Sequence, residues 1–162
     1  ANDDGIKAAS IYMFSYMIMN VAIFAILLSL KVKNEYLINI SDLKGLSKSN
    51  PIVSLSISII MLSMAGIPPF IGFFGKFYVF IAAIEQELYV LSVLGVLASV
   101  ISAFYYLRII KIMYFDESKS EGIINFKISF QSKIILFLSL FLIICFIFYP
   151  SLLINISASL TI

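Results

Sequence analysis

The stretch that decides the fold is Leu62-Ser-Met-Ala-Gly-Ile-Pro-Pro-Phe-Ile-Gly-Phe-Phe-Gly-Lys-Phe-Tyr78. Three helix-breaking residues interrupt its apolar run: Gly66, Pro68 and Pro69. A proline lacks the backbone N–H and clashes with the carbonyl group four residues earlier, so the carbonyls of Met64 and Ala65 lose their helical donors. In lipid, such a break survives only where it is buried in protein or lines a water-filled cavity. A lysine, Lys76, follows the break and indicates a segment that handles ions.

The composition is that of an integral membrane protein. Of the 162 residues, 62% are hydrophobic and 12% are charged, and the mean hydropathy is +1.08. Soluble domains have about 45–50% apolar and about 25% charged residues. The net charge of +2, with no basic stripe, gives no indication of nucleic-acid binding. The chain has no histidine and a single cysteine, Cys145, which leaves no ligand set for zinc, haem or an iron–sulfur cluster and no disulfide. Any redox chemistry must therefore belong to a partner.

Four apolar stretches predict membrane spans, since a span needs about 20 apolar residues. They cover about 8–30, 51–84, 88–114 and 134–156 of a single membrane segment, 1–162, without a separate soluble domain. The predicted fold is all-α, with about four transmembrane helices, one of them discontinuous at Gly66-Ile-Pro-Pro69. In the first span three polar residues recur every four positions, so they share one helix face, which we expect to pack against other helices: Tyr12, Tyr16 and Asn20.

The first residues, Ala-Asn-Asp-Asp-Gly, contain no initiator methionine and no basic n-region, so they do not resemble a signal peptide. They are typical of a loop in a longer protein. We therefore expect the chain to be a fragment or a split gene product.

The segment 51–84 has two interpretations. An unbroken helix of this length would be about 51 Å long, well beyond a membrane core of about 30 Å. It is either one interrupted span or two short spans joined by a turn. The connections 31–50 and 108–133 are rich in lysine, whereas the connection between them has Glu85 and Glu87 and no basic residue. A single crossing places both basic connections on one side, which the positive-inside rule assigns to the cytoplasm or its equivalent. We favour one broken span, with both termini on the outer side.

Lys76 is the only Lys, Arg, Asp or Glu within the apolar core of any predicted span, because Arg108 and Lys111 stand toward the inner end of theirs. It lies nine residues from Glu85, about 13 Å along a helix, too far for its charge to reach the interface easily. A lysine near mid-membrane costs about 2.5–3.5 kcal/mol on insertion scales, and such residues usually mark ion or proton pathways. The alternative is a lysine that pairs with an acidic group elsewhere and serves only assembly.

Other residues near the break have weaker predicted roles. Gly72 and Gly75 suit close helix packing, although glycine is frequent in membrane helices. Tyr78, Tyr105 and Tyr106 are candidate hydroxyl relays, but tyrosines near helix ends more often anchor the helix at the interface. Two further basic residues, Arg108 and Lys111, are expected at the interface. One buried charge does not make a relay, so this chain alone is not expected to be a complete pump.

The sequence Ser63-Met-Ala-Gly-Ile-Pro-Pro-Phe-Ile-Gly-Phe-Phe-Gly-Lys-Phe-Tyr-Val-Phe80 resembles the subunit N family of proton-pumping NADH:quinone oxidoreductase, respiratory complex I. Flanking pieces agree in order: Ser15-Tyr-Met-Ile-Met-Asn20, Asp42-Leu-Lys-Gly-Leu46, Asn50-Pro51 and Tyr105-Tyr-Leu-Arg-Ile-Ile-Lys-Ile-Met-Tyr114. The agreement covers roughly residues 10–115 and is specific as a set. After Glu117 the resemblance is supported only by the presence of one more hydrophobic helix.

The resemblance implies the last four of about fourteen helices in an antiporter-like subunit. In that family a discontinuous helix carries a lysine in the outer half of a proton channel, and Lys76 falls on that position. Tyr105 and Tyr106 match the family's tyrosine run. The chain itself would hold no cofactor. NAD, FMN, iron–sulfur clusters and quinone are expected in partner subunits.

The implied partners are the other membrane-arm subunits, the preceding helices of the same subunit and the lipid bilayer. The implied location is a bacterial plasma membrane or a mitochondrial inner membrane. Two alternatives remain: a related subunit of a multisubunit Na⁺/H⁺ antiporter, and a structural scaffold in which Lys76→Met would be silent.

Overall fold

The computed structural model describes residues 3–32, 35–36, 39–117 and 130–145. These residues form six α-helices: α1 (Asp3–Leu27), α2 (Leu46–Ser49), α3 (Pro51–Ala65), α4 (Ile71–Glu85), α5 (Tyr89–Phe115) and α6 (Phe130–Cys145). They also include a short 3-10 helix, η1 (Ile40–Leu43), and one antiparallel pair of two-residue strands, β1 (Lys31–Val32) and β2 (Glu35–Tyr36). The predicted all-helical class therefore holds apart from this strand pair. The end of the predicted last span, 146–156, lies outside the described residues.

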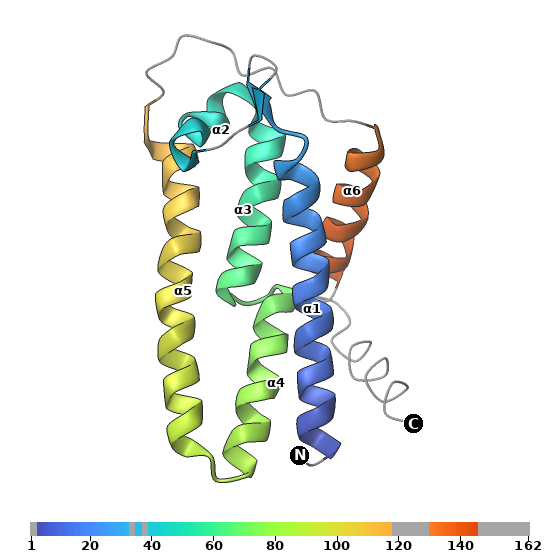
Figure 1. The fold of residues 1–162 in the computed structure, drawn as a ribbon, viewed down its shortest axis with the longest axis vertical. Helices are drawn as coiled ribbons and strands as arrows, with labels where there is room; N and C mark the ends of the chain where they lie inside the picture. Colours follow the sequence, from blue (N-terminus) through green and yellow to red (C-terminus); the bar gives the residue numbers. More distant parts are fainter. Residues whose placement is uncertain (1–2, 33–34, 37–38, 118–129, 146–162) are drawn as a thin grey trace.

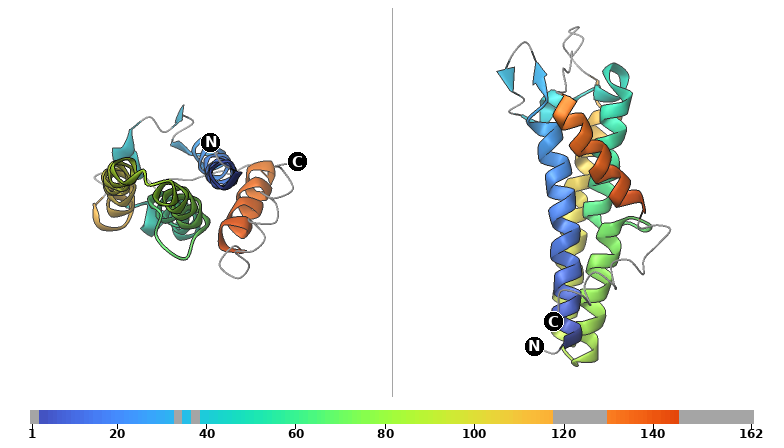
Figure 2. Two further views of the ribbon diagram at one scale, coloured as in Figure 1. Left: turned by 90° about the horizontal axis from the view of Figure 1, so that it is seen from below. Right: turned by 90° about the vertical axis from the view of Figure 1, so that its right-hand side faces the viewer.

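The helices form an elongated bundle (Figure 1). The long helices α1 and α5 run along its length, and α3 and α4 lie end to end beside them. In the main contacts, α1 packs on α4, α5 packs on α3, and α6 packs on α1 (Figure 2). The helix α1 begins at Asp3, before the apolar residues that defined the predicted span, because Asp3 and Asp4 suit the positive end of a helix.

The core lies where α1 meets α3 and the start of α4. Its fully buried side chains include Met19, Ile26, Ile57, Ile60 and Ile71. The helix α5 differs, since its apolar side chains face outward along most of its length. An apolar surface of this extent is typical of contact with lipid or with further helices. By length and composition, α1 and α5 are the two described helices that are able to cross a membrane alone.

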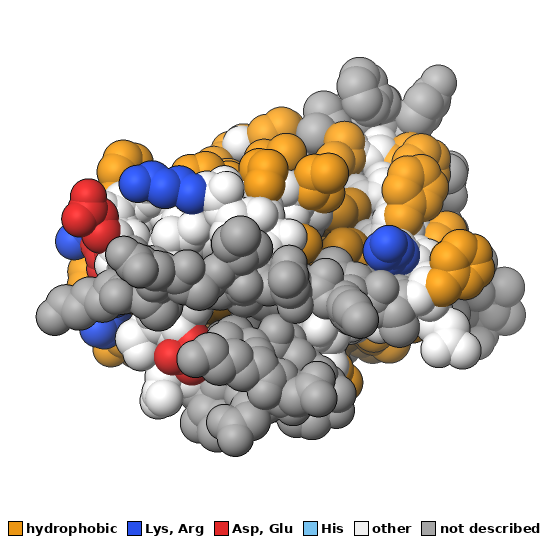
Figure 3. Space-filling view, turned by 90° about the horizontal axis from the view of Figure 1, so that it is seen from above, with side chains coloured by type: hydrophobic (Ala, Val, Ile, Leu, Met, Phe, Trp, Pro, Cys, Tyr) orange, Lys and Arg blue, Asp and Glu red, His pale blue; other side chains and the backbone are white. Residues whose placement is uncertain are grey.

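Charged residues collect at the two ends of the bundle. The end that holds η1, α2 and the start of α6 carries six basic and four acidic residues in the described part of the chain: Lys31, Lys44, Lys48, Arg108, Lys111 and Lys133, with Glu35, Asp42, Asp116 and Glu117. Figure 3 looks onto this end, where charged side chains lie around the rim. The opposite end carries four acidic residues and one lysine: Asp3, Asp4, Glu85, Glu87 and Lys7. Among the described residues the first end, the basic end, therefore has a net positive charge, and the opposite end, the acidic end, has a net negative charge.

The connection between α1 and α3 covers the basic end of the bundle. It folds as η1 and α2, which pack on α3 and α5 through the buried side chains of Leu43 and Leu46. Gly45 permits the tight link between them, because its φ of 68° lies in the left-handed region. The helix α3 then begins at Pro51, where the missing proline N–H needs no partner.

Candidate functional site at the α3–α4 junction

The C-terminus of α3 is closed by a glycine in the left-handed conformation. Gly66 has φ 83°, and its N–H donates to the carbonyl of Ser63 at 2.9 Å. The N–H of Ile67 donates to the carbonyl of Leu62 at 3.1 Å. These two bonds form a Schellman motif, which satisfies two of the four carbonyls left open at the end of a helix.

Lys76 satisfies the other two carbonyls. Its Nζ donates to the carbonyl oxygen of Met64 at 3.1 Å and to that of Ala65 at 3.2 Å. In a continuous helix these acceptors would bind the N–H groups of residues 68 and 69, which here are prolines. The positive ammonium group also lies at the negative end of the α3 dipole, which is its favourable place.

A side chain of α3 in turn caps the start of α4. The Ser63 Oγ accepts a hydrogen bond from the N–H of Gly72 at 3.2 Å and donates to the Sδ of Met19 on α1 at 3.1 Å. Ser63 and Met19 are both fully buried. Each of the two short helices therefore supplies the side chain that satisfies the open end of the other.

The glycines at the junction permit contacts that a side chain would block. A Cβ at Gly72 would overlap the carbonyl oxygen of Ser63. At Gly75 it would lie 3.3 Å from the Oγ of Ser15, where α4 packs on α1. At Gly66 it would lie 3.0 Å from the Cδ of Lys76.

An open groove of about 340 Å³ runs between α4 and α5 beside the junction. Lys76 lines it together with Ala65 and Gly66. The rest of its wall is aromatic or aliphatic, except for Ser99 of α5. A half-buried cation therefore borders an apolar groove.

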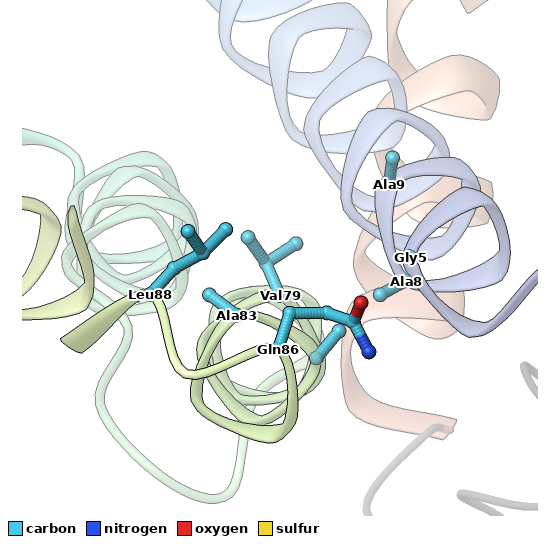
Figure 4. Close-up of a pocket in the computed structure, with 8 residues that line it drawn as sticks. Gly5, Ala8, Ala9, Val79, Ala83, Gln86 and Leu88 are labelled. Atoms are coloured by element: carbon cyan, nitrogen blue, oxygen red, sulfur yellow. The ribbon is translucent and has the colours of Figure 1, made fainter. Parts of the chain in front are cut away.

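A second groove, of about 450 Å³, lies between the start of α1 and the end of α4 (Figure 4). Its walls are small or aliphatic side chains, among them Ala8, Ala9 and Ala83, with Gln86 as the polar member. None of its lining residues is charged or nucleophilic, so this groove offers packing rather than chemistry.

The structure separates two of the three candidate tyrosines, Tyr105 and Tyr106. Tyr105 faces outward, with 58% of its surface exposed, and its ring packs edge-on against Phe104. Tyr106 is half-buried against the core, and its side chain interacts with that of Tyr16 on α1. Tyr16 also packs on Tyr12, with ring centroids 4.6 Å apart. Neither Tyr105 nor Tyr106 is among the residues that line the groove beside Lys76.

Sequence reasoning missed two of these contacts. Ser63 lies within the quoted motif, and its one available signal was that it is a hydroxyl residue next to a helix end. Tyr16 was expected to pack against a neighbouring helix, but its contact with Tyr106 depends on how α1 and α5 are placed. The described residues contain no group of three or more metal-ligating side chains.

Two short helices whose facing ends are open to ion-binding groups are typical of ion-transporting membrane proteins. The chain belongs to the NADH:quinone oxidoreductase/Mrp antiporter transmembrane family, whose model matches residues 1–102. The resemblance seen in the motifs is thereby confirmed.

Individual relatives support the same family assignment. The chain is 54% identical over 115 residues to NADH-quinone oxidoreductase subunit N of Parvibaculum lavamentivorans, covering 71% of this chain and 24% of the relative. It is 46% identical over 155 residues to the subunit of the same name from Pelagibacter ubique, covering 96% of this chain and 32% of the relative. The chain thus spans about a quarter to a third of the length of these curated relatives.

A solved structure, respiratory complex I from Thermus thermophilus with bound aureothin, has the same fold over 92% of this chain and 34% of the matched chain. The TM-score is 0.76 and the sequence identity is 23%.

Proposed function

We propose that this chain forms the C-terminal part of an antiporter-like subunit N and contributes the outer half of a proton channel in a proton-pumping NADH:quinone oxidoreductase. Lys76 is the residue that carries the proton. One observation bears most of this proposal: the Nζ of Lys76 lies at the open end of α3, bound to two backbone carbonyls and bordering a groove. Intramembrane lysines of this kind usually mark ion pathways.

The proposed topology has four crossings, at about 8–30, 51–84, 88–114 and 134–156. The helices α3 and α4 have 15 residues each, about 22 Å, so neither alone spans a core of about 30 Å. Stacked end to end, they supply one crossing that is discontinuous at Gly66-Ile-Pro-Pro69. The basic end of the bundle then lies on the cytoplasmic side and the acidic end on the outer side.

In this proposal the chain takes part in an enzyme without carrying its redox site. NAD, FMN, iron–sulfur clusters and quinone belong to partner subunits, and quinone reduction there drives proton movement here. The partners are other membrane-arm subunits and the helices that precede this segment in the full-length relatives. The location is a bacterial plasma membrane, since the relatives named above are bacterial.

Tyr105 and Tyr106 do not suit the proposed route equally. Tyr106 is the stronger candidate for a hydroxyl that passes a proton, because it is half-buried and interacts with Tyr16. Tyr105 is exposed and would reach the route only through water.

The test replaces Lys76 by methionine, which keeps much of the side-chain length and removes the charge, in the assembled complex. We expect normal assembly and a lower ratio of protons pumped to electrons transferred. Lys111→Met, which removes an exposed charge at the basic end of α5, is the control and should pump normally. An unchanged pumping ratio in fully assembled Lys76→Met would refute the role of Lys76. A purely structural scaffold predicts the same unchanged pumping ratio.

The family model also covers Mrp antiporters, so a subunit of a multisubunit Na⁺/H⁺ antiporter is the alternative. The relatives above carry the oxidoreductase name. Genes for quinone-oxidoreductase subunits beside this gene would exclude the alternative.

A further inference from the structure

We propose that the C-terminus of α3 is a binding site for a primary ammonium ion, which Lys76 occupies as a tethered ligand. A free alkylammonium ion of matching length would then bind there when the lysine side chain is removed. This inference deepens the proposed function, and only the pumping measurement in its test rests on that function.

The number of acceptors defines the site. Of the four carbonyls that end α3, those of Leu62 and Ser63 accept bonds from the backbone of the turn. In a continuous helix the carbonyls of Met64 and Ala65 would accept hydrogen bonds from residues 68 and 69, but both are prolines without an N–H. The two carbonyls therefore need donors from elsewhere in the molecule. Two adjacent oxygens at the negative end of a helix dipole suit a cation with several N–H groups.

The shape of the site also suits a slender ligand. The lysine side chain passes directly over Gly66, where an added Cβ would lie 3.0 Å from its Cδ and 3.4 Å from its Nζ. The bound end makes hydrogen bonds of 3.1 and 3.2 Å, so the ligand must carry N–H groups. A tetraalkylammonium ion has the charge but no N–H, so it does not meet this requirement.

The cation is held by dipoles rather than by a carboxylate. Among the described residues, no acidic side chain forms an ion pair with Lys76, whose Nζ instead binds the carbonyls of Met64 and Ala65. The helices packed on α4 carry their described acidic residues at the ends of the bundle, such as Asp3 and Asp4 on α1 and Asp116 after α5. The two carbonyls therefore account for the binding of the ammonium group.

The experiment uses Lys76→Ala in the full-length subunit within the purified, assembled complex. The substitution removes the atoms from Cγ to Nζ, which together have the length of n-propylammonium. Hydrogen exchange of the backbone over 62–72 reports whether the junction is closed. Loss of the two charge-assisted hydrogen bonds to the carbonyls of Met64 and Ala65 is expected to raise exchange about tenfold or more. Adding n-propylammonium should restore slow exchange in a saturable manner, and tetramethylammonium should not.

The outcomes separate this inference from the proposed function. Lys111→Ala is the matched control, in which neither ion should change exchange over 62–72. The proposal is overturned if Lys76→Ala exchanges like the native complex, or if n-propylammonium acts no better than tetramethylammonium. Should Lys76→Ala fail to assemble, Lys76→Met takes its place, and unchanged exchange in that variant overturns the proposal. If Lys76→Ala loses pumping but exchanges like the native complex, the proton route is supported and the ammonium site is refuted. If it exchanges faster, is restored by n-propylammonium and pumps normally, the ammonium site is supported and the proton route is refuted.

Discussion

Replacement of Gly72 by alanine is the substitution that the junction should tolerate least. The new Cβ would overlap the carbonyl oxygen of Ser63 and lie 3.2 Å from the Sδ of Met19, both of which are fully buried. The first obstacle is backbone, which cannot rotate away, so the overpacking cost should reach about 3 kcal/mol. The hydrogen bond from the Gly72 N–H to the Ser63 Oγ would also be disturbed, at about 1 kcal/mol.

Alanine favours the helix by about 1 kcal/mol over glycine, which offsets part of this cost. The net destabilisation of the junction is about 3 kcal/mol, or roughly a hundredfold in its opening equilibrium. Hydrogen exchange of the backbone over 62–72 in the assembled complex measures this equilibrium. The thermal midpoint of the complex is a second readout and should fall.

Gly95→Ala is the matched control, since it makes the same change on α5. Its Cβ would lie 2.7 Å from the Cε1 of Phe80, the far end of a ring that is able to rotate. The rotation costs about 1 kcal/mol and the gain in helix propensity is about the same, so the net effect should be near zero. Close packing at Gly72 is refuted if the backbone around residue 72 in Gly72→Ala exchanges no faster than the backbone around residue 95 in Gly95→Ala.

Three further predictions concern the same region. Gly66→Ala should destabilise the junction by about 1–2 kcal/mol in hydrogen exchange, because a residue with a Cβ is strained at φ 83°. Gly66→Asn should cost less, because asparagine adopts the left-handed conformation more readily than alanine. Ser63→Ala should cost about 1 kcal/mol by the same measurement, whereas Ser56→Ala, whose hydroxyl bonds within its own helix, should cost nearly nothing. Tyr106→Phe should lower the pumping rate about fivefold, the effect of one hydrogen bond, while Tyr105→Phe should leave it unchanged; equal rates in the two would remove Tyr106 from the route.

Part of the site follows from local chemistry alone. The positions of Pro68 and Pro69 dictate that the carbonyls of Met64 and Ala65 need outside donors, whatever the rest of the chain does. The presence of one lysine in apolar sequence is equally visible. That this lysine is the donor depends on the direction of α4 relative to α3, which no local pattern contains.

The two contacts that the sequence did not predict, Ser63 with Gly72 and Tyr16 with Tyr106, also depend on how the helices pack. Ser63 caps α4 because α4 starts beside the last turn of α3, and this closeness requires Gly72. Tyr106 meets Tyr16 across two helices that are far apart in the sequence. A side chain's partner across a bundle is set by helix packing, and the spacing of residues on one helix predicts only the face on which it lies.

The count of donors and acceptors at the junction connects its stability to its proposed function. A charged lysine has three N–H groups and a neutral one has two, whereas the site presents two carbonyls, those of Met64 and Ala65. Lys76 is therefore able to release a proton without leaving either buried acceptor unsatisfied, provided that its two remaining N–H groups keep their partners. A buried group that lost a partner at each turnover would incur about 1–3 kcal/mol every time. An arginine would hold the same carbonyls but would stay charged, because its guanidinium does not deprotonate in proteins. Lys76→Arg should thus keep the junction closed in hydrogen exchange and stop pumping, a combination that neither a purely structural lysine nor an unused one would give.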